Sequence, residues 1–243
     1  MNVKKMGCAK SRPRSSEEII ISAAEEGLGF QDINVHLIDS TFRKFSHMGR
    51  INQAQLKRIS RQLRISIVDF GPHVKINEMF YNLRKEEGEY FLRDLLVIGI
   101  MLGKGSNIDK ASLLFQVFDE TSEGVIEISR LRDQVFKTIF QHCVNSLGNL
   151  VTTQQCSESL ELKNRKYLDE LKQVEADGIK KICDQIIADK TSKVIDEAEF
   201  VRVMCEFEMG NLLSSFGFRT FFKEVFNTSP PKKVWSNPFG KKK

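Results

Sequence analysis

Proline, tryptophan and tyrosine are scarce in this chain of 243 residues, which holds five Pro, one Trp and three Tyr beside 18 Phe. Most of the prolines lie close to the two ends. The abundance of Phe suits the apolar faces of helices. The length allows one large or two small domains with an ample core.

Cysteine is also sparse and follows no disulfide or metal-binding pattern. The five Cys are odd in number, and none belongs to a CxxC pair, which favours a reducing compartment with buried thiols. The first residues are basic and polar, unlike a signal peptide. The longest apolar run, Leu95 to Leu102, is too short to cross a bilayer. We therefore expect a cytoplasmic protein.

Motifs for catalysis are missing. The sequence has no H-E-x-x-H pair, no Gly-rich phosphate loop and no recognisable context for a Ser or Cys nucleophile. Its four His are scattered along the chain at His36, His47, His73 and His142. We expect a protein that is not an enzyme.

The positive charge is concentrated at the two ends. Residues 1–14 and 228–243 carry five basic residues each and no acidic one, so the net charge of +5 becomes −5 for the body between them. Because the basic residues are not organised on a folded face, we expect no nucleic-acid partner. The tails either contact an anionic membrane or polymer, or are solvated and disordered.

The most informative stretch is Leu113 to Arg130. An apolar helix runs into Asp119, a polar turn follows, and a second amphipathic run from Leu131 to Phe140 leaves it. Gly124 at the sixth loop place permits a sharp turn, and Ile126 at the eighth place is positioned to pair with a sister loop. This is the helix–loop–helix plan of the EF-hand calcium loop.

The ligands of this loop are incomplete. Oxygens for calcium are available from Asp119, Thr121, Glu123, Glu127 and the carbonyl of Val125. The twelfth place, which needs a bidentate Glu, holds Arg130, whose guanidinium has only donors. We predict a vestigial loop with no metal site and no cofactor, in which Arg130 pairs with Asp119 or Glu123. Weak calcium binding at this loop stays open.

Three further loops repeat the pattern with poorer ligands. Residues 46–55 contain Gly49-x-Ile51, residues 84–94 place Gly88 and Tyr90 in the equivalent positions, and residues 188–199 keep Ile195 but put Lys193 in the place of Gly. We therefore predict an all-α fold of four EF-hand-like helix–loop–helix units in two pairs, with short β-bridges between paired loops.

The predicted organisation has five parts. They are a basic, partly disordered arm with a short helix (1–30), a degenerate EF-hand pair (31–104), a second pair (105–209) with an insertion (145–175), an apolar helix (210–227) and a basic tail (228–243). Within the insertion, residues 145–159 have the composition of a linker or mobile loop.

The apolar helix near the C-terminus has two interpretations. It lies in the groove of its own EF-hands, or it binds a partner. The first is favoured because monomers seldom expose so large an apolar patch. The candidate partner-binding residues are Leu212, Leu213, Phe216, Phe218, Phe221 and Phe222.

The N-terminus contains a lipidation motif. Residues 6–11 fit M-G-x-x-x-[ST], so Gly7 is a candidate for myristoylation and Cys8 for palmitoylation. Acylation of Gly7 requires that translation begins at Met6 or that the preceding residues are removed. Only an acylated Gly7 would bring the protein to a membrane.

From Phe42 to Phe200, about two thirds of the chain, the order of these parts resembles the recoverin and calcineurin-B superfamily of four-EF-hand proteins. The run Asp94 to Gly105 followed by Asp109 to Asp119 carries most of the likeness. Residues 177–182 and 212–217 are similar to calaxin-type proteins of ciliary outer dynein arms. That family binds calcium through acidic loops, whereas every loop here lacks essential ligands.

The resemblance implies a calcium-independent structural adaptor in a ciliary axoneme, docked to helical or coiled-coil partners of the outer dynein arm. Its basic tails would contact acidic polymers such as tubulin tails. Two alternatives remain: a membrane-anchored, calcineurin-B-like regulatory subunit, and a weak calcium sensor that works through the Asp119 loop.

Overall fold

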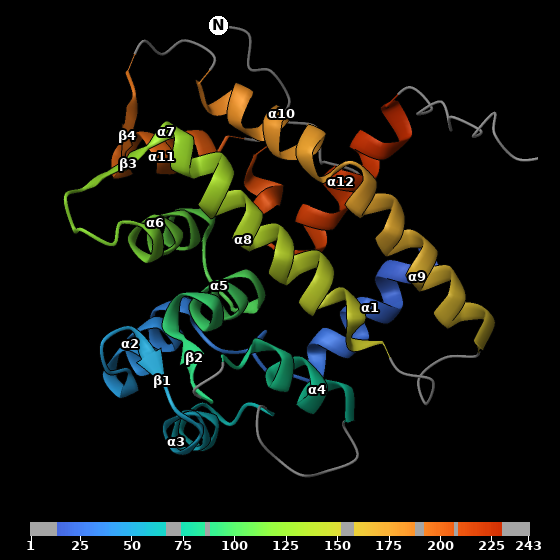
Figure 1. The fold of residues 1–243 in the computed structure, drawn as a ribbon, viewed down its shortest axis with the longest axis horizontal. Helices are drawn as coiled ribbons and strands as arrows, with labels where there is room; N and C mark the ends of the chain where they lie inside the picture. The colour runs from blue at the N-terminus through green and yellow to red at the C-terminus, as the bar shows by residue number, and fades with distance from the viewer. Residues whose placement is uncertain are drawn as a thin grey trace, which may run out of the picture.

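A computed structural model describes residues 14–66, 74–85, 88–151, 158–187, 192–206 and 209–229. Nearly all of the two basic tails, with Gly7 and Cys8, therefore lies outside the described residues. The described part is mostly helical and contains two small antiparallel strand pairs (Figure 1). The expectation of a predominantly helical fold is confirmed.

Within the described residues, the first half of the chain builds five helices around one strand pair. They are α1 (Ser16–Glu26), α2 (Val35–Phe45), β1 (Arg50–Ile51), α3 (Gln53–Leu63), α4 (Val74–Leu83), β2 (Tyr90–Phe91) and α5 (Leu92–Leu102).

The second half repeats this order and then extends it. Its elements are α6 (Asn107–Phe118), β3 (Val125–Glu127), α7 (Ile128–Arg130), α8 (Lys137–Phe140), α9 (Glu158–Gln173), α10 (Glu175–Ile187), β4 (Val194–Asp196), α11 (Glu197–Met204) and α12 (Ser215–Thr228). Short 3-10 turns at Gly148–Leu150 and Gly210–Leu213 complete it.

The predicted pairing between loops is confirmed. β1 and β2 are antiparallel with Ile51 opposite Tyr90, and β3 and β4 are antiparallel with Ile126 opposite Ile195. Ile126 and Ile195 occupy the eighth loop place, and Ile51 and Tyr90 occupy the equivalent place in the two shorter loops; all four are buried. An apolar side chain at this place therefore joins each loop to its sister and to the core.

Glycine at the sixth place, or at the equivalent place in the two shorter loops, has the conformation that the turn demands. Gly49, Gly88 and Gly124 have φ angles of 71°, 76° and 71°. Residues with a Cβ rarely adopt this left-handed region, so the sequence signal was specific.

Side-chain caps fix where several helices begin. The Ser15 hydroxyl accepts a hydrogen bond from the backbone N–H of Glu18 at the start of α1. Asn52 and Gln55 form a capping box on α3. Such caps satisfy backbone donors that have no partner inside the helix.

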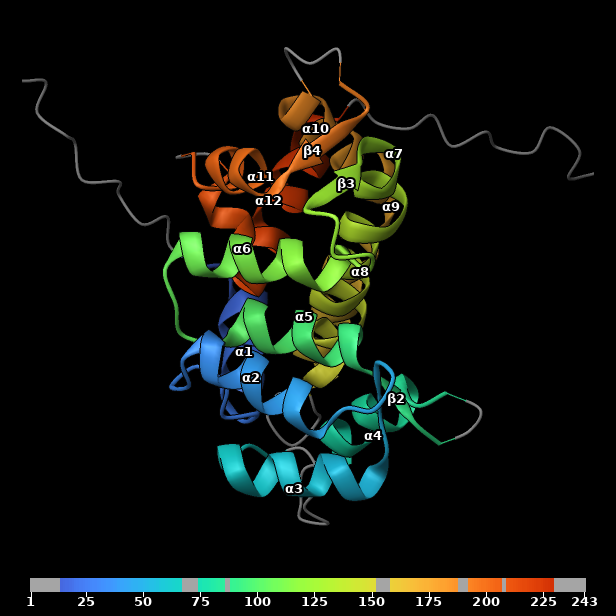
Figure 2. The same cartoon turned by 90° about the vertical axis from the view of Figure 1, so that its left-hand side faces the viewer.

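The helices form a stack in which α11, α6, α5, α2 and α3 follow one another, with α3 outermost (Figure 2). The core runs through this stack: the rings of Phe115 on α6 and Phe200 on α11 lie 5.7 Å apart. On α2, Val35, Ile38 and Phe42 are buried.

The helix that leaves the Asp119 loop is longer than predicted. From Ile128 it continues to Ser146 and includes two π-helical segments, Leu131–Phe136 and Gln141–Ser146. Each π segment changes which side chains face the core. The second one places His142 inside the protein, where it is 3% exposed.

The predicted linker at 145–159 is wrong for its first part. Residues 145–151 continue the long helix into the 3-10 turn, and Leu147, Leu150 and Val151 are buried. Their apolar side chains pack against the core, which outweighs the loop-forming tendency of the surrounding Asn, Ser and Gly. Residues 158–159 already belong to α9, and 152–157 lie outside the described residues.

Candidate functional site

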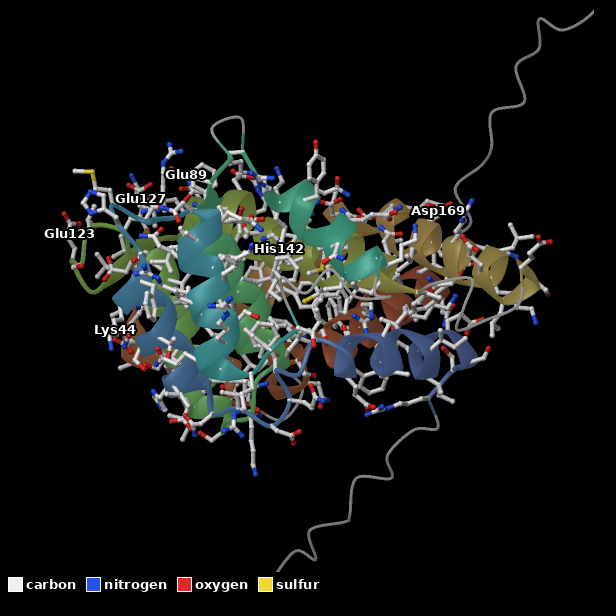
Figure 3. The ribbon with its side chains drawn as sticks, turned by 90° about the horizontal axis from the view of Figure 1, so that it is seen from below. Lys44, Glu89, Glu123, Glu127, His142 and Asp169 are labelled. Carbon is white, nitrogen blue, oxygen red and sulfur yellow. The ribbon has the colours of Figure 1, made fainter. Side chains whose placement is uncertain are left out.

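The Asp119 loop is organised by Asp119 itself. Its carboxylate accepts hydrogen bonds from the backbone N–H groups of Glu123 (3.1 Å) and Gly124 (2.8 Å). Thr121, Glu123 and Glu127 are exposed. Figure 3 shows Glu123 at the outer edge of the molecule. The first ligand place thus holds the turn together, while the other oxygens face solvent.

Arg130 has partners that differ from those predicted. Its Nη2 donates to the carbonyl of Phe118 (3.3 Å) and lies 3.5 Å from the carboxylate of Glu120, while Nε donates to Gln134 (3.0 Å). The predicted pairing with Asp119 or Glu123 is therefore wrong. The last carbonyls of a helix have no partner within it and attract cations, and Phe118 is the last residue of α6.

The donor set of this loop does not fit a calcium ion. Calcium takes six to eight oxygen ligands, and here a guanidinium stands in the place of the bidentate Glu. Among the described residues, no three His, Cys, Asp or Glu side chains are grouped so that they would hold a metal. The predicted absence of a metal and of a cofactor stays a prediction.

In the loop at residues 84–94, the last residue is Asp94, and its carboxylate has a partner on another helix. Asp94 is 8% exposed, and its carboxylate lies 3.4 Å from Nε2 of His142. Lys85 and Arg93 are each 3.9 Å away. Burial raises the pKa of Asp94, but the hydrogen bond and charge of His142, with the two cations, lower it overall. Asp94 therefore ties α5 to the long helix that follows the Asp119 loop.

The six candidate partner-binding residues divide into two groups. Leu212, Leu213, Phe218 and Phe222 are at most 2% exposed, whereas Phe216 and Phe221 are half-buried. The prediction of a partner surface is corrected for the first four, which are core residues. α12, which holds Phe218 and Phe222, packs against α9, α10 and the long helix. The 3-10 turn that holds Leu212 and Leu213 packs against α12, α6 and α11. The favoured interpretation, a helix held by its own protein, is the one observed.

Close packing holds α12 in place. The Phe222 ring lies 4.8 Å from that of Phe140 and 5.0 Å from that of Phe218. A Cβ at Gly178 on α10 would come within 2.4 Å of the Phe222 ring. Only glycine lets α10 approach α12 this closely.

A buried charge cluster joins the two ends of the fold, and the sequence pattern gave no sign of it. Arg219 on α12 is 0% exposed and donates to both carboxylate oxygens of Glu18 (2.8 and 2.9 Å) and to Glu25 (2.7 Å) on α1. Its Nη1 also donates to the carbonyl of Cys143 (3.0 Å), and Tyr167 on α9 donates to Glu18 (2.6 Å). The cluster thus connects α1, α9, α12 and the long helix, and Figure 1 shows α1, α9 and α12 in one region.

The charges in this cluster depend on one another. Burial lowers the pKa of Arg219, but the carboxylates of Glu25 and Glu18 raise it well above its ordinary value. Burial and the neighbouring Glu18 carboxylate raise the pKa of the Tyr167 hydroxyl. Arg219 is therefore a permanent buried cation, held by two acids nearly 200 residues away in the sequence.

An apolar groove opens between the loops of the two halves. This loop-side groove has a volume of about 450 Å³, and its apolar lining is Met48, Phe91, Leu92, Leu96 and Val117. Met48 is 89% exposed, although it is apolar. Arg43, Arg93 and Glu120 lie at its edge. An exposed apolar residue beside an apolar groove is typical of a surface that binds protein.

The basic residues are distributed differently from the expectation. Besides the tails, α3 presents Arg58 and Arg61 on its exposed side, and the exposed Arg64 follows at its C-cap. The premise that no folded face gathers basic residues is therefore wrong.

No described helix is long and apolar enough to span a membrane.

Comparison with known proteins adds no family: no family model, no curated protein and no solved structure matches this chain. Its function must be argued from its own residues.

Proposed function

We propose that this protein is a non-enzymatic adaptor of EF-hand type that binds helical or coiled-coil partners without calcium. Its fold supports the EF-hand half of the proposal. Each of the four short strands lies between two helices, and the strands join in two antiparallel pairs at the residues that the EF-hand spacing predicts. Left-handed glycines at the sixth place of the Asp119 loop and at the equivalent place of two shorter loops add to this support.

The observation that carries the calcium-independent half is the position of Arg130. Its guanidinium contacts the Phe118 carbonyl and the Glu120 carboxylate, so a built-in cation occupies the end of the loop where the bidentate ligand belongs. The turn of this loop is held from within by hydrogen bonds from the backbone N–H groups of Glu123 and Gly124 to Asp119.

The loop-side groove is the proposed binding site for the partner. An amphipathic helix would place apolar anchors against Met48, Phe91 and Leu92, which line the open groove beside buried Leu96 and Val117. Arg43 and Arg93 at the edge would meet acidic residues of that helix. The core position of α12 leaves this groove uncovered by the apolar C-terminal segment.

The cellular setting of the proposal rests on the resemblance to calaxin-type proteins alone. On this resemblance, the proposed setting is a ciliary axoneme at the outer dynein arm. The protein would bind coiled-coil partners there, and its basic tails would contact tubulin. The competing settings are a regulatory subunit anchored through Gly7 and a weak calcium sensor.

The test is capture of partners from a ciliated-cell extract by the tagged full chain, with calcium and with chelator in parallel. We expect the same helical or coiled-coil partners in both conditions, and their loss from Met48→Glu. Leu162→Glu on α9 is the matched control, because Leu162 is also an exposed apolar residue (69%) but lies outside the groove. Capture only with calcium, or of a phosphatase, kinase or channel, would replace the proposal by an alternative.

A further inference from the structure

One segment of the chain carries a concentrated positive charge. Residues 40–68 contain seven Lys and Arg and no Asp or Glu. Because residues 15–227 together carry −5, the remainder of that span carries −12. Residues 15–227 therefore combine a basic segment with a strongly acidic remainder.

The structure places this charge on the outermost helix. α3 turns Leu56, Ile59 and Leu63 inward, and all three are buried. Its opposite side bears the exposed Arg58 and Arg61, which lie one turn apart on one side of the helix. The exposed Arg64 follows at the C-cap of α3. We call these three arginines the α3 basic face. Figure 2 shows α3 at the end of the stack of described helices.

Among the residues that the structure describes, none forms an ion pair with Arg58, Arg61 or Arg64. By contrast, other exposed arginines are neutralised by their own helix, as Arg202 is by Glu199 and Glu206. Repulsion among these guanidinium groups raises the free energy of the protein. Binding of an anionic partner would lower it.

We propose that the α3 basic face binds a glutamate-rich segment of a partner protein. Guanidinium groups form paired hydrogen bonds with carboxylates, and arginine supplies all three side chains of this face. Arg58 and Arg61 are about 4.5 Å apart along the helix axis, at 1.5 Å per residue, and Arg64 follows at the C-cap. An extended peptide spans the distance between Arg58 and Arg61 in about two residues, so a short acidic run is sufficient.

The surroundings favour a short peptide over a longer polyanion or a membrane. A nucleic-acid duplex continues beyond the face and would meet the acidic remainder of the body, which repels phosphates. A membrane-surface helix inserts its apolar side, but α3 uses that side for the protein's own core. The proposal is independent of the loop-side groove and of calcium.

The experiment measures binding of fluorescent hexaglutamate to the full chain by anisotropy, at low and at physiological salt. The test variant combines Arg58→Gln, Arg61→Gln and Arg64→Asn. Asn is chosen because Arg64 has a φ of 56°, which Asn tolerates. The control combines Lys163→Gln, Arg165→Gln and Lys166→Gln, three exposed basic residues on α9. The tails contribute equally to all these proteins.

We expect the test variant to bind hexaglutamate about tenfold more weakly, and the control to bind like the original protein. Equal weakening in both variants would show non-specific attraction and overturn the proposal. Tighter binding of a charge-matched DNA duplex or of phosphatidylserine vesicles, lost in the test variant, would overturn the choice of ligand. Should the triple variant unfold, Arg61→Gln alone is expected to weaken binding measurably, and unchanged binding would overturn the proposal.

Discussion

Arg219 and Glu18, which are 201 residues apart in the sequence, form a bidentate ion pair with N–O distances of 2.8 and 2.9 Å. Both side chains are almost completely buried. Glu25 and Tyr167 complete the hydrogen bonds of this pair. The N-terminal helix is therefore fixed to the C-terminal helix by charge as well as by apolar packing.

Arg219→Met is expected to lower the free energy of unfolding by about 3–5 kcal/mol, because removing one partner leaves uncompensated charges buried. Glu18 and Glu25 would then face each other without their cation. Urea unfolding followed by circular dichroism measures the change. Arg202→Met is the matched control: Arg202 also pairs with two glutamates, but its side chain is 60% exposed. A similarly small change in both variants would argue against a structural role for the cluster.

Asp94 is expected to make stability depend on acid pH. Its pKa is lower in the folded protein than its ordinary value, so between these two values the unfolded chain binds more protons. The Asp94 contribution is present above about pH 4 and is lost as the pH falls through the lower, folded pKa. Asp94→Asn should therefore flatten the stability curve below about pH 4. Exposed Asp32→Asn is the control, and an unchanged slope in Asp94→Asn would refute the assignment.

Calcium is expected to bind only after the twelfth loop place is repaired. Arg130→Glu adds two carboxylate oxygens and removes a repelling cation, so titration calorimetry should detect binding that the original chain lacks in the sensor range of about 0.1–10 μM. Arg130→Gln removes the cation without supplying the carboxylate and should stay silent. No heat in Arg130→Glu would mean that the loop has lost more than one ligand. Heat in the original chain would instead support the sensor alternative.

Phe222→Ala is expected to destabilise the fold by about 3–5 kcal/mol, as truncation of a fully buried Phe does. Its ring fills the space between Phe140, Phe218 and Gly178. Phe221→Ala on the same helix is the control and should have a smaller effect, because Phe221 is only half-buried. Thermal melts of both variants make the comparison. Equal, minor losses would revive the interpretation of α12 as a partner-binding element.

The sequence was most informative where structure depends on a few neighbouring residues. The glycine at the sixth loop place and the apolar residue at the eighth predicted both strand pairs, because a left-handed turn and an inward-facing strand residue are local requirements. The amphipathic pattern likewise located a helical run over Leu131 to Phe140, where it leaves the Asp119 loop.

Composition gave a wrong prediction where buried apolar side chains outweigh the loop-forming tendency of their polar neighbours. Residues 145–151 contain Asn, Ser and Gly, yet Leu147, Leu150 and Val151 keep them against the core. In the candidate site, the sequence identified Arg130 as the residue that displaces a ligand, but it named the wrong partners. The long Arg130 side chain can reach several acceptors, so its partners depend on the tertiary structure. They are the Phe118 carbonyl and Glu120.

By itself, the sequence determined the predominantly helical character, the glycine turns and the pairing of the loops, because each is set by a short run of adjacent residues. Only the tertiary structure decided which charges are buried together and which stay in solvent. Arg219 and Arg61 are indistinguishable as amphipathic-helix arginines, yet one is sealed against two acids and the other is exposed. The difference arises because desolvation and Coulomb attraction depend on distances in space, which helices far apart in the sequence create only when they pack.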